Sequence, residues 1–468
     1  MHRRTLVLTA LIIVISGAGG FLAAPADRCA GVRTAESLLA EGAAPTGDTP
    51  AVVYSFWEPR VIELGRTETV TLTAVVRGAV TAVVVDQFNG MPQIPLLLTT
   101  PDTYQVSIDV ARVLDGYRRG RLQHKVGRLQ VRDGQVLVFS KRISVNVRSK
   151  GVPDVEVLPL ASDAQAAAHI LNLRRDEPWL GTGDPIAVEV ANRFYQFYDD
   201  DFDFIAFVGN VSPTSNRFYS RVRNDVTGIG LTLFDISAAL GSAGRLQGVI
   251  SFPIPTLFDL GGHGAVHEIG HRWISHLNEL SMLAPGTPHW PISDLANGVM
   301  GWSSPSGVGV SFPYRLMHDR NGDYLLQRSR LNDRFHDLEL YLMGLTVAES
   351  VGDHLVFLNQ EQRGEVRDGG VLQGPVAWVS TQDLIDALGP RTPAAGDSQT
   401  DFRLATIVLS AGGLLSPGEM AFFDHMAARG EARRTLRAAN DSRQQATVQP
   451  FFVATARRAT LTTTLSNP

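Results

Sequence analysis

The chain of 468 residues is long enough for about three domains and for a large apolar core. Hydrophobic residues make up 44% of it and charged residues 19%, which excludes a disordered or low-complexity protein. The formal net charge of -5 gives no general attraction to nucleic acid, so no nucleic-acid partner is expected. Cys29 is the single cysteine, which excludes intrachain disulfides, cysteine-ligated zinc fingers and iron–sulfur clusters.

Residues 1–26 have the pattern of an export signal. Two arginines precede an almost unbroken apolar run from Leu6 to Ile15, and Ala24-Pro25-Ala26 fits a cleavage site with small residues. We therefore expect a cleaved signal peptide, a secreted or periplasmic protein, and no membrane span in the mature chain. An uncleaved membrane anchor is the alternative, because residues 5–26 carry no charge.

The next part of the chain is predicted to be a flexible lead-in followed by an all-β domain. Residues 27–48 are rich in Ala, Gly, Pro and Thr, which is typical of a flexible segment. Residues 49–150 show the period of two that half-buried strands have, most clearly from Thr67 to Val76, and Asp133-Gly134 is a strong hairpin signal. Further strands are expected at residues 81–85, 103–108, 128–131, 135–139 and 143–147. Short strands at this spacing predict an immunoglobulin-like β-sandwich.

A domain boundary is predicted at Lys150-Gly151-Val152-Pro153, because helical and strand-like patterns are mixed from residue 151 to residue 468. Asp184-Pro185 can begin a helix, and Ser416 to Glu419 form a capping box at the start of another. The pattern predicts helices over residues 185–198 and 417–429 and strands over residues 202–208, 230–234, 246–252 and 458–465.

The distribution of histidines gives the main functional clue, since five of the 12 fall within the 27 residues from His263 to His289. In His267-Glu268-Ile269-Gly270-His271, two histidines stand four residues apart, so on a helix both imidazoles can face one metal ion. Glu268 points beside that ion and can take a proton from metal-activated water. The motif predicts a zinc (Zn²⁺) site with His267 and His271 as ligands and Glu268 as the general base.

The segment from Gly261 to Leu345 resembles the zincin metallopeptidases, and more narrowly a group of poorly characterised exported bacterial zinc metalloproteases. The resemblance rests on His267 to Trp273, on the pair His289-Trp290, and on Leu338 to Gly344. It implies metal-dependent hydrolysis of peptide bonds and a helix packed under a mostly antiparallel-edged sheet. The expected fold class is therefore α+β, with a zincin-like metallopeptidase domain over residues 151–468 preceded by the sandwich.

The third metal ligand has two candidates. The metzincin spacing is absent, because Leu277 stands where that family has its third histidine. His289 follows a predicted helix from Gly262 to Leu280 and a Pro-Gly turn, which allows the chain to return to the metal. Glu339 is the alternative, on a helix as in thermolysin-like enzymes but at a longer spacing than is usual there.

The sequence thus predicts an exported zinc-dependent metallopeptidase that acts on polypeptides. Alternatives are a catalytically inactive zincin-like binding or adhesion protein and a zinc hydrolase of a non-peptide amide. Tyr341, His336 and Arg272 are candidates for stabilising the oxyanion, and Met343 with Tyr341 for the floor of the site, although both also fit an ordinary helix core. No phosphate-binding glycine loop with Lys-Ser/Thr is present, so no nucleotide partner is expected.

Overall fold

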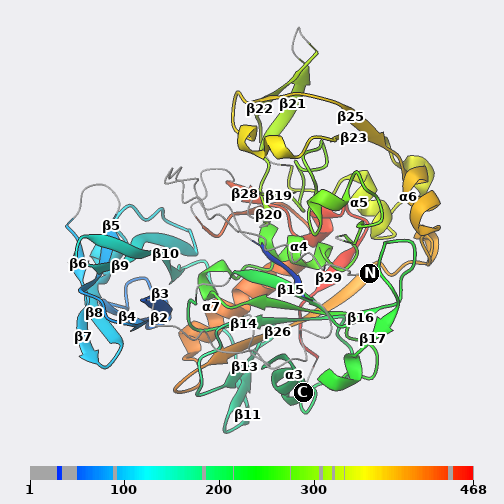
Figure 1. The fold of residues 1–468 in the computed structure, drawn as a ribbon. Coiled ribbons are helices and arrows are strands. Elements are labelled where there is room, and N and C mark those ends of the chain that lie inside the picture. Colours follow the sequence, from blue (N-terminus) through cyan, green and yellow to red (C-terminus); the bar gives the residue numbers. More distant parts are fainter. Residues whose placement is uncertain are drawn as a thin grey trace, which may run out of the picture.

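The computed structural model describes residues 29–33, 50–87, 92–181, 186–213, 216–274, 276–304, 309–318, 322–330, 332–440 and 446–466. The expected signal peptide and most of the expected lead-in lie outside these residues, as does Asp184-Pro185. The described chain is a mixed α/β structure in which an all-β part lies beside a larger part with one long sheet (Figure 1). None of the helices in these ranges has the length and apolarity that a membrane crossing requires.

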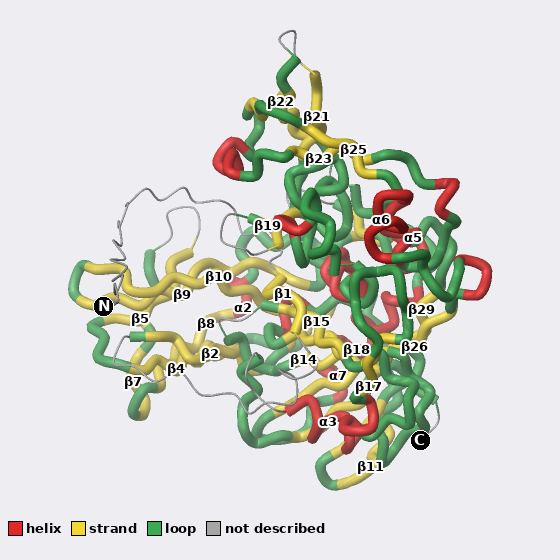
Figure 2. Tube along the Cα trace, turned by 45° about the vertical axis from the view of Figure 1, so that its right-hand side comes forward, coloured by secondary structure: helices red, strands yellow, loops and turns green. Residues whose placement is uncertain are grey.

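The all-β part consists of two sheets that enclose one apolar core, visible as two layers in Figure 2. Alternate residues of Thr69–Arg77 (Val70, Leu72, Ala74 and Val76) point into this core, as the period of two predicts. One sheet has the order β2 (Ala51–Glu58), β4 (Thr69–Arg77), β8 (Thr103–Asp109), β7 (Leu97–Thr100). The other has the order β3 (Val61–Glu63), β10 (Val136–Arg148), β9 (Gln123–Asp133), β5 (Ala82–Gln87), β6 (Ile94–Pro95).

The predicted hairpin at Asp133-Gly134 is confirmed, but the two strands expected after it are one strand. Asp133 pairs with Val136 across the turn, and Gly134 adopts a φ of 57° that favours glycine. Residues 140–142, which are polar and resemble a turn, instead continue β10 opposite β9. Their polar side chains have partners in the folded protein: Ser140 Oγ accepts from Arg128, and Lys141 donates to the carbonyl oxygens of Ser212 and Pro213.

An eleven-stranded sheet forms the centre of the larger part. Its order is β11 (Leu158–Ala161), β12 (Ala164–Ala166), β13 (Leu171–Arg174), β26 (Asp401–Ser410), β14 (Phe204–Val208), β18 (Gly248–Phe252), β15 (Arg217–Arg221), β1 (Cys29–Arg33), β20 (Gly309–Val310), β19 (Trp302–Ser303), with β29 (Thr460–Thr462) beside β26. The strands from β13 to β18 are parallel, whereas β15 runs antiparallel to β18. Residues 29–33, which fall within the expected lead-in, form a strand of this sheet.

Helices cover both faces of this sheet, which explains why β14 is apolar at every position. Phe204 and Ala206 face the same core as α4 (His263–Gly270) and α7 (Pro417–Ala428). Ile205 and Phe207 face the opposite core, which α3 (Ile186–Phe194) closes.

The remaining helices are α2 (Val110–Val113), α5 (Asp337–Leu342), α6 (Thr381–Leu388) and α8 (Phe451–Ala454). Small sheets are formed by β16 (Arg223–Asn224) with β17 (Phe234–Asp235), by β21 (Tyr314–His318), β22 (Tyr324–Arg328) and β24 (Val371–Leu372), by β23 (His354–Phe357) with β25 (Val376–Val379), and by β27 (Leu436–Arg437) with β28 (Thr447–Val448).

The capping box predicted for α7 is confirmed, and it also joins the two parts of the protein. The Glu419 amide N–H donates to Ser416 Oγ, while Glu419 Oε2 accepts from the Ser416 amide N–H. The other oxygen, Glu419 Oε1, accepts from the amide N–H of Arg60 in the sandwich at 3.0 Å. One side chain thus caps the helix and holds the sandwich against it.

The helix that carries the metal-binding motif is shorter than predicted. It ends at Gly270 and not at Leu280, and the chain then continues in turns. A Cβ at Gly270 would lie 2.6 Å from Met300 Sδ, so the end of α4 is packed closely against another loop. The apolar residues after it, Trp273 and Leu277, are buried without being helical.

Candidate metal centre

Three buried histidines from two separate segments meet at one point. His267 lies on α4, His271 at its C-cap, and His289 eighteen residues further along the chain. Each offers one ring nitrogen, and the three nitrogens lie within 4.8 Å of one another. The expectation that these residues lie close enough to bind one metal ion is confirmed.

The spacing of the two helix histidines fits a bound cation better than a hydrogen bond. Their Nε2 atoms are 3.2 Å apart. His267 Nδ1 lies 2.8 Å from the carbonyl oxygen of Val299, and a carbonyl only accepts, so Nδ1 carries the proton and Nε2 presents a lone pair. The Ile274 carbonyl gives His271 the same tautomer, at the longer distance of 3.4 Å. Two lone pairs repel at this distance unless a cation lies between them, and tetrahedral zinc separates two imidazole nitrogens by about 3.3 Å.

The charge state of the histidines also suits metal binding. Burial, followed by the effects of the neighbouring His271 and His289 rings, holds the pKa of His267 well below its usual value. Burial lowers the pKa of His271 in the same way, and burial with the nearby Arg217 lowers the pKa of His289 to about 3. All three imidazoles are therefore neutral at neutral pH, which is the form that ligates metal.

The position of His289 is held by its neighbour in the sequence. Trp290 is 2% exposed, forms a bridge to Trp302 of β19, and donates its indole N–H to Glu339 Oε1 at 2.7 Å. Neither ring nitrogen of His289 has a hydrogen-bond partner in the part of the chain that the structure describes. A buried imidazole without a partner is costly, and a metal ion would satisfy it.

Glu339, the rival ligand, is not part of this group. It is fully buried on α5, where its Oε2 accepts from the amide N–H of His336 at 2.7 Å and its Oε1 from Trp290. Burial raises its pKa. Glu339 therefore contacts Trp290, the residue that follows His289, and orients it.

Glu268 has a partner that the sequence did not indicate. It is fully buried, and its Oε1 lies 3.1 Å from Nε of Arg217, which is itself 2% exposed on β15. A Cβ at Gly264 would lie 2.8 Å from this guanidinium, so Arg217 crosses the first turn of α4 closely. The cation offsets the cost of burying the carboxylate.

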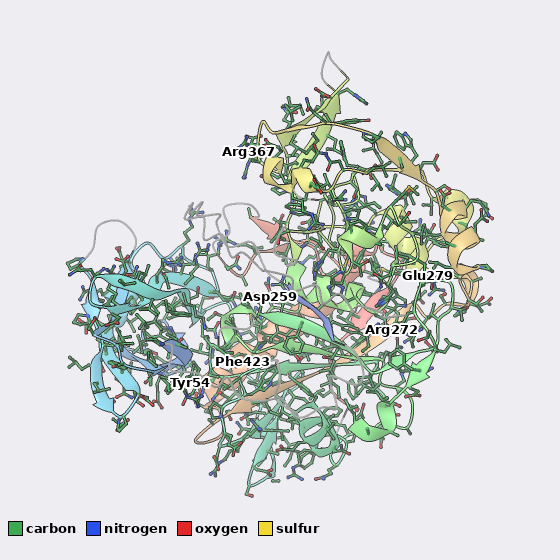
Figure 3. All side chains as sticks on the ribbon, viewed as in Figure 1. Tyr54, Asp259, Arg272, Glu279, Arg367 and Phe423 are labelled. Atoms are coloured by element: carbon green, nitrogen blue, oxygen red, sulfur yellow. The ribbon has the colours of Figure 1, made fainter. Side chains whose placement is uncertain are left out.

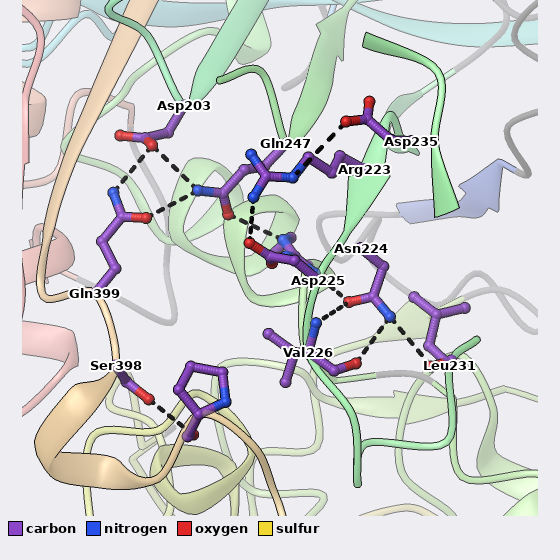
Figure 4. Close-up of polar contacts among 12 residues, drawn as sticks. Asp203, Arg223, Asn224, Asp225, Val226, Leu231, Asp235, Gln247, Ser398 and Gln399 are labelled. Atoms are coloured by element: carbon purple, nitrogen blue, oxygen red, sulfur yellow. Dashed lines mark hydrogen bonds and ion pairs between the residues drawn. The ribbon is translucent and has the colours of Figure 1, made fainter. Parts of the chain in front are cut away.

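Of the candidates for stabilising an oxyanion, Arg272 is bound elsewhere. Its guanidinium donates to Gln247, Asn224 and Asp225 at 2.7–3.0 Å, and it is 2% exposed (labelled in Figure 3). Figure 4 shows its partners Gln247, Asn224 and Asp225, of which Gln247 also donates to Asp203 at 3.1 Å. The buried charge of Arg272 is thus used to join α4 to the sheet, and the proposed oxyanion role is not supported.

The remaining predicted residues take structural positions. The His336 ring lies 3.2 Å from the Asn297 carbonyl, and Tyr341 and Met343 are buried in the core that contains α4. Their roles in the site stay predictions. Met300, which sequence reasoning missed, lies against Gly270, and the preceding Val299 orients His267. The sequence held no spacing that could have indicated Val299, Met300 or Arg217.

Gly309 is expected to be essential for the position of His289. A Cβ at Gly309 would lie 2.2 Å from His289 Nε2 and 2.3 Å from Cε1, which is far inside van der Waals contact. Gly309→Ala should therefore displace the ring and weaken zinc binding at least about tenfold, as loss of ligand orientation does. Gly364→Ala is the matched control, since a Cβ there has no atom within 4 Å. Equal zinc affinity of the two variants, measured with a competing chelator, would contradict this packing.

Comparison of the chain with protein-family models, with curated proteins and with solved structures gives no match. The case for a function consequently rests on the site itself.

Proposed function

We propose that the protein is an exported zinc metallopeptidase with a zincin-like catalytic part. One observation supports this most: His267, His271 and His289 are neutral, buried and directed at one point, and Glu268 directly follows the first of them. Three protein ligands leave a fourth position open, as catalytic zinc sites do, whereas structural sites are closed.

Zinc, when bound, supplies a Lewis acid that activates water at neutral pH and polarises the scissile carbonyl. The residues of the chain bind the ion and transfer the proton. The neutral imidazoles of His267, His271 and His289 would hold the ion, and the Val299 carbonyl fixes the orientation of the first. The Glu268 carboxylate takes a proton from the attacking water and passes it to the leaving amine. Arg217, whose Nε lies 3.1 Å from Glu268 Oε1, offsets the cost of burying this carboxylate before substrate binds.

That contact also favours a second candidate, a protein that binds metal without hydrolysis. A carboxylate with a guanidinium beside it is stabilised in its ionised form and accepts a proton less readily. If Arg217 keeps this contact when substrate binds, Glu268 is a poor base and the site only holds the ion. The two candidates differ in activity and not in metal content.

The proposal is tested by metal analysis and a protease assay on the same preparation of the full chain. We expect about one zinc ion per chain, hydrolysis of a labelled unfolded protein such as casein, loss of hydrolysis after treatment with a chelator, and recovery when zinc is restored. Zinc binding without hydrolysis of any polypeptide would favour the non-catalytic candidate. Absence of stoichiometric metal would overturn both.

A further inference from the structure

A cavity of about 530 Å³ lies where the sandwich meets the larger part of the protein. The sandwich contributes the chain after β3, the loop before β9 and the chain after β10, and the larger part contributes the end of α7 and β27. β3 and β10 contact α7 at this junction (Figure 1). The volume is within the range of about 300–1,000 Å³ that is usual for small-molecule sites. None of the three histidines of the metal centre lines this cavity, so it is a separate candidate site.

Among the described residues, the charged side chains that line the cavity are all basic. They are Arg119 and Lys150 of the sandwich and Arg429 and Arg437 of the larger part. Arg429 has a counterion, because its guanidinium donates to the two carboxylate oxygens of Asp259 at 2.8 and 3.0 Å. The other three side chains are exposed and form no ion pair with an acidic residue that the structure describes. The cavity therefore carries three positive charges that the described chain does not balance.

The packing at the junction brings cations from the two parts of the protein into this one cavity. Gly120 in the sandwich has a φ of 82°, and a Cβ there would lie 3.0 Å from Arg437 Nη1, so the guanidinium lies directly against the glycine backbone. Arg429 Nη2 donates to the Arg437 carbonyl oxygen at 2.9 Å, which holds β27 beside the end of α7. Burial and the nearby Arg429 lower the pKa of His425, so its ring is neutral at neutral pH and offers one N–H donor.

We propose that this cavity binds a phosphate monoester group. Such a group carries about −1.5 to −2 charges at pH 7 and three acceptor oxygens, whereas a carboxylate carries a single charge and would leave most of the positive charge unbalanced. The guanidinium groups of Arg119 and Arg437 suit paired hydrogen bonds to phosphate oxygens, and Lys150 supplies a point charge. The organic part of the ligand would contact the apolar lining, which consists of Leu64, Leu122, Ala438 and Ala439.

Calorimetric titration of the full chain with glucose 6-phosphate tests this proposal. We expect one molecule bound per chain with a dissociation constant below about 1 mM, and binding of glucuronate, which has one carboxylate on a similar ring, at least about tenfold weaker. Uncharged glucose should not bind. The affinity for glucose 6-phosphate should be the same before and after treatment with a chelator, because the cavity lies apart from the metal centre.

A soluble ester and a lipid headgroup present the same phosphate group, and vesicles distinguish these two sources. Vesicles with phosphatidic acid carry the monoester on a membrane surface, and vesicles of phosphatidylcholine alone are their control. Retention of the chain on the first vesicles, without binding of glucose 6-phosphate, would identify a lipid headgroup as the ligand. Binding of glucose 6-phosphate without retention would identify a soluble ester.

Substitutions of exposed side chains separate a defined site from a general effect of charge. Arg437→Gln and Lys150→Gln should each weaken binding of the phosphate probe at least about tenfold, because each removes a charged hydrogen-bond donor. Arg434→Gln is the matched control, since it removes the same charge from an exposed residue that does not line the cavity. Thermal unfolding of each variant shows whether it folds as the native chain does.

Three results would overturn the proposal: no saturable binding of either phosphate probe, equal affinity for glucuronate, or unchanged affinity of Arg437→Gln. Each of them would leave the proposed function standing, because the cavity shares no residue with the metal centre. Conversely, absence of zinc or of hydrolysis would not affect the expected binding of phosphate.

Discussion

Glu268→Gln is expected to lower peptide hydrolysis at least about 10²-fold while one zinc ion per chain remains bound. The amide cannot take a proton from water, but it keeps the size of the carboxylate and an oxygen that still accepts from Arg217. The variant should therefore fold, although Arg217 loses its counterion. Activity is measured on the variant after its zinc content and its thermal unfolding have been determined.

Glu279→Gln is the matched control, because Glu279 is exposed beyond the end of α4 and its change should leave hydrolysis unaltered. Near-normal activity of zinc-loaded Glu268→Gln would show that Glu268 is not the base. The same result would also contradict the non-catalytic candidate, because that candidate predicts that the native chain hydrolyses no polypeptide.

His289→Ala should reduce zinc affinity by more than about 100-fold, which exceeds the loss caused by residues that only orient ligands. The variant leaves the ion with two protein ligands, His267 and His271, whose nitrogens are 3.2 Å apart. Glu339→Gln should keep the ion with a smaller loss of affinity, because the remaining amide oxygen can still accept from Trp290. Affinity is measured by competition with a chromophoric chelator.

His318→Ala is the control for removal of a histidine, since His318 is exposed on β21 and belongs to no group of potential ligands in the described chain. If His289→Ala retained stoichiometric zinc and Glu339→Gln lost it, the carboxylate would be the third ligand. The site would then have to rearrange, because both oxygens of Glu339 are used by Trp290 and His336.

Short-range patterns determined much of the fold. The capping box at Ser416, the turn at Gly134 and the apolar strand at residues 204–208 all depend on residues within a few positions of one another. The length of α4, in contrast, was not determined by short-range patterns. Its apolar residues continue with helical spacing to Leu280, yet turns bury them equally well, and periodicity does not distinguish the two. The close packing of Met300 on Gly270 is a contact between distant segments.

The same division applies to the metal centre. The sequence by itself determined that His267 and His271 share one side of α4, because four residues make about one helical turn. Only the tertiary structure decided which third residue joins them. Trp290, held by β19 and Glu339, brings His289 to the helix. Such contacts depend on how distant segments pack, and no local spacing encodes them.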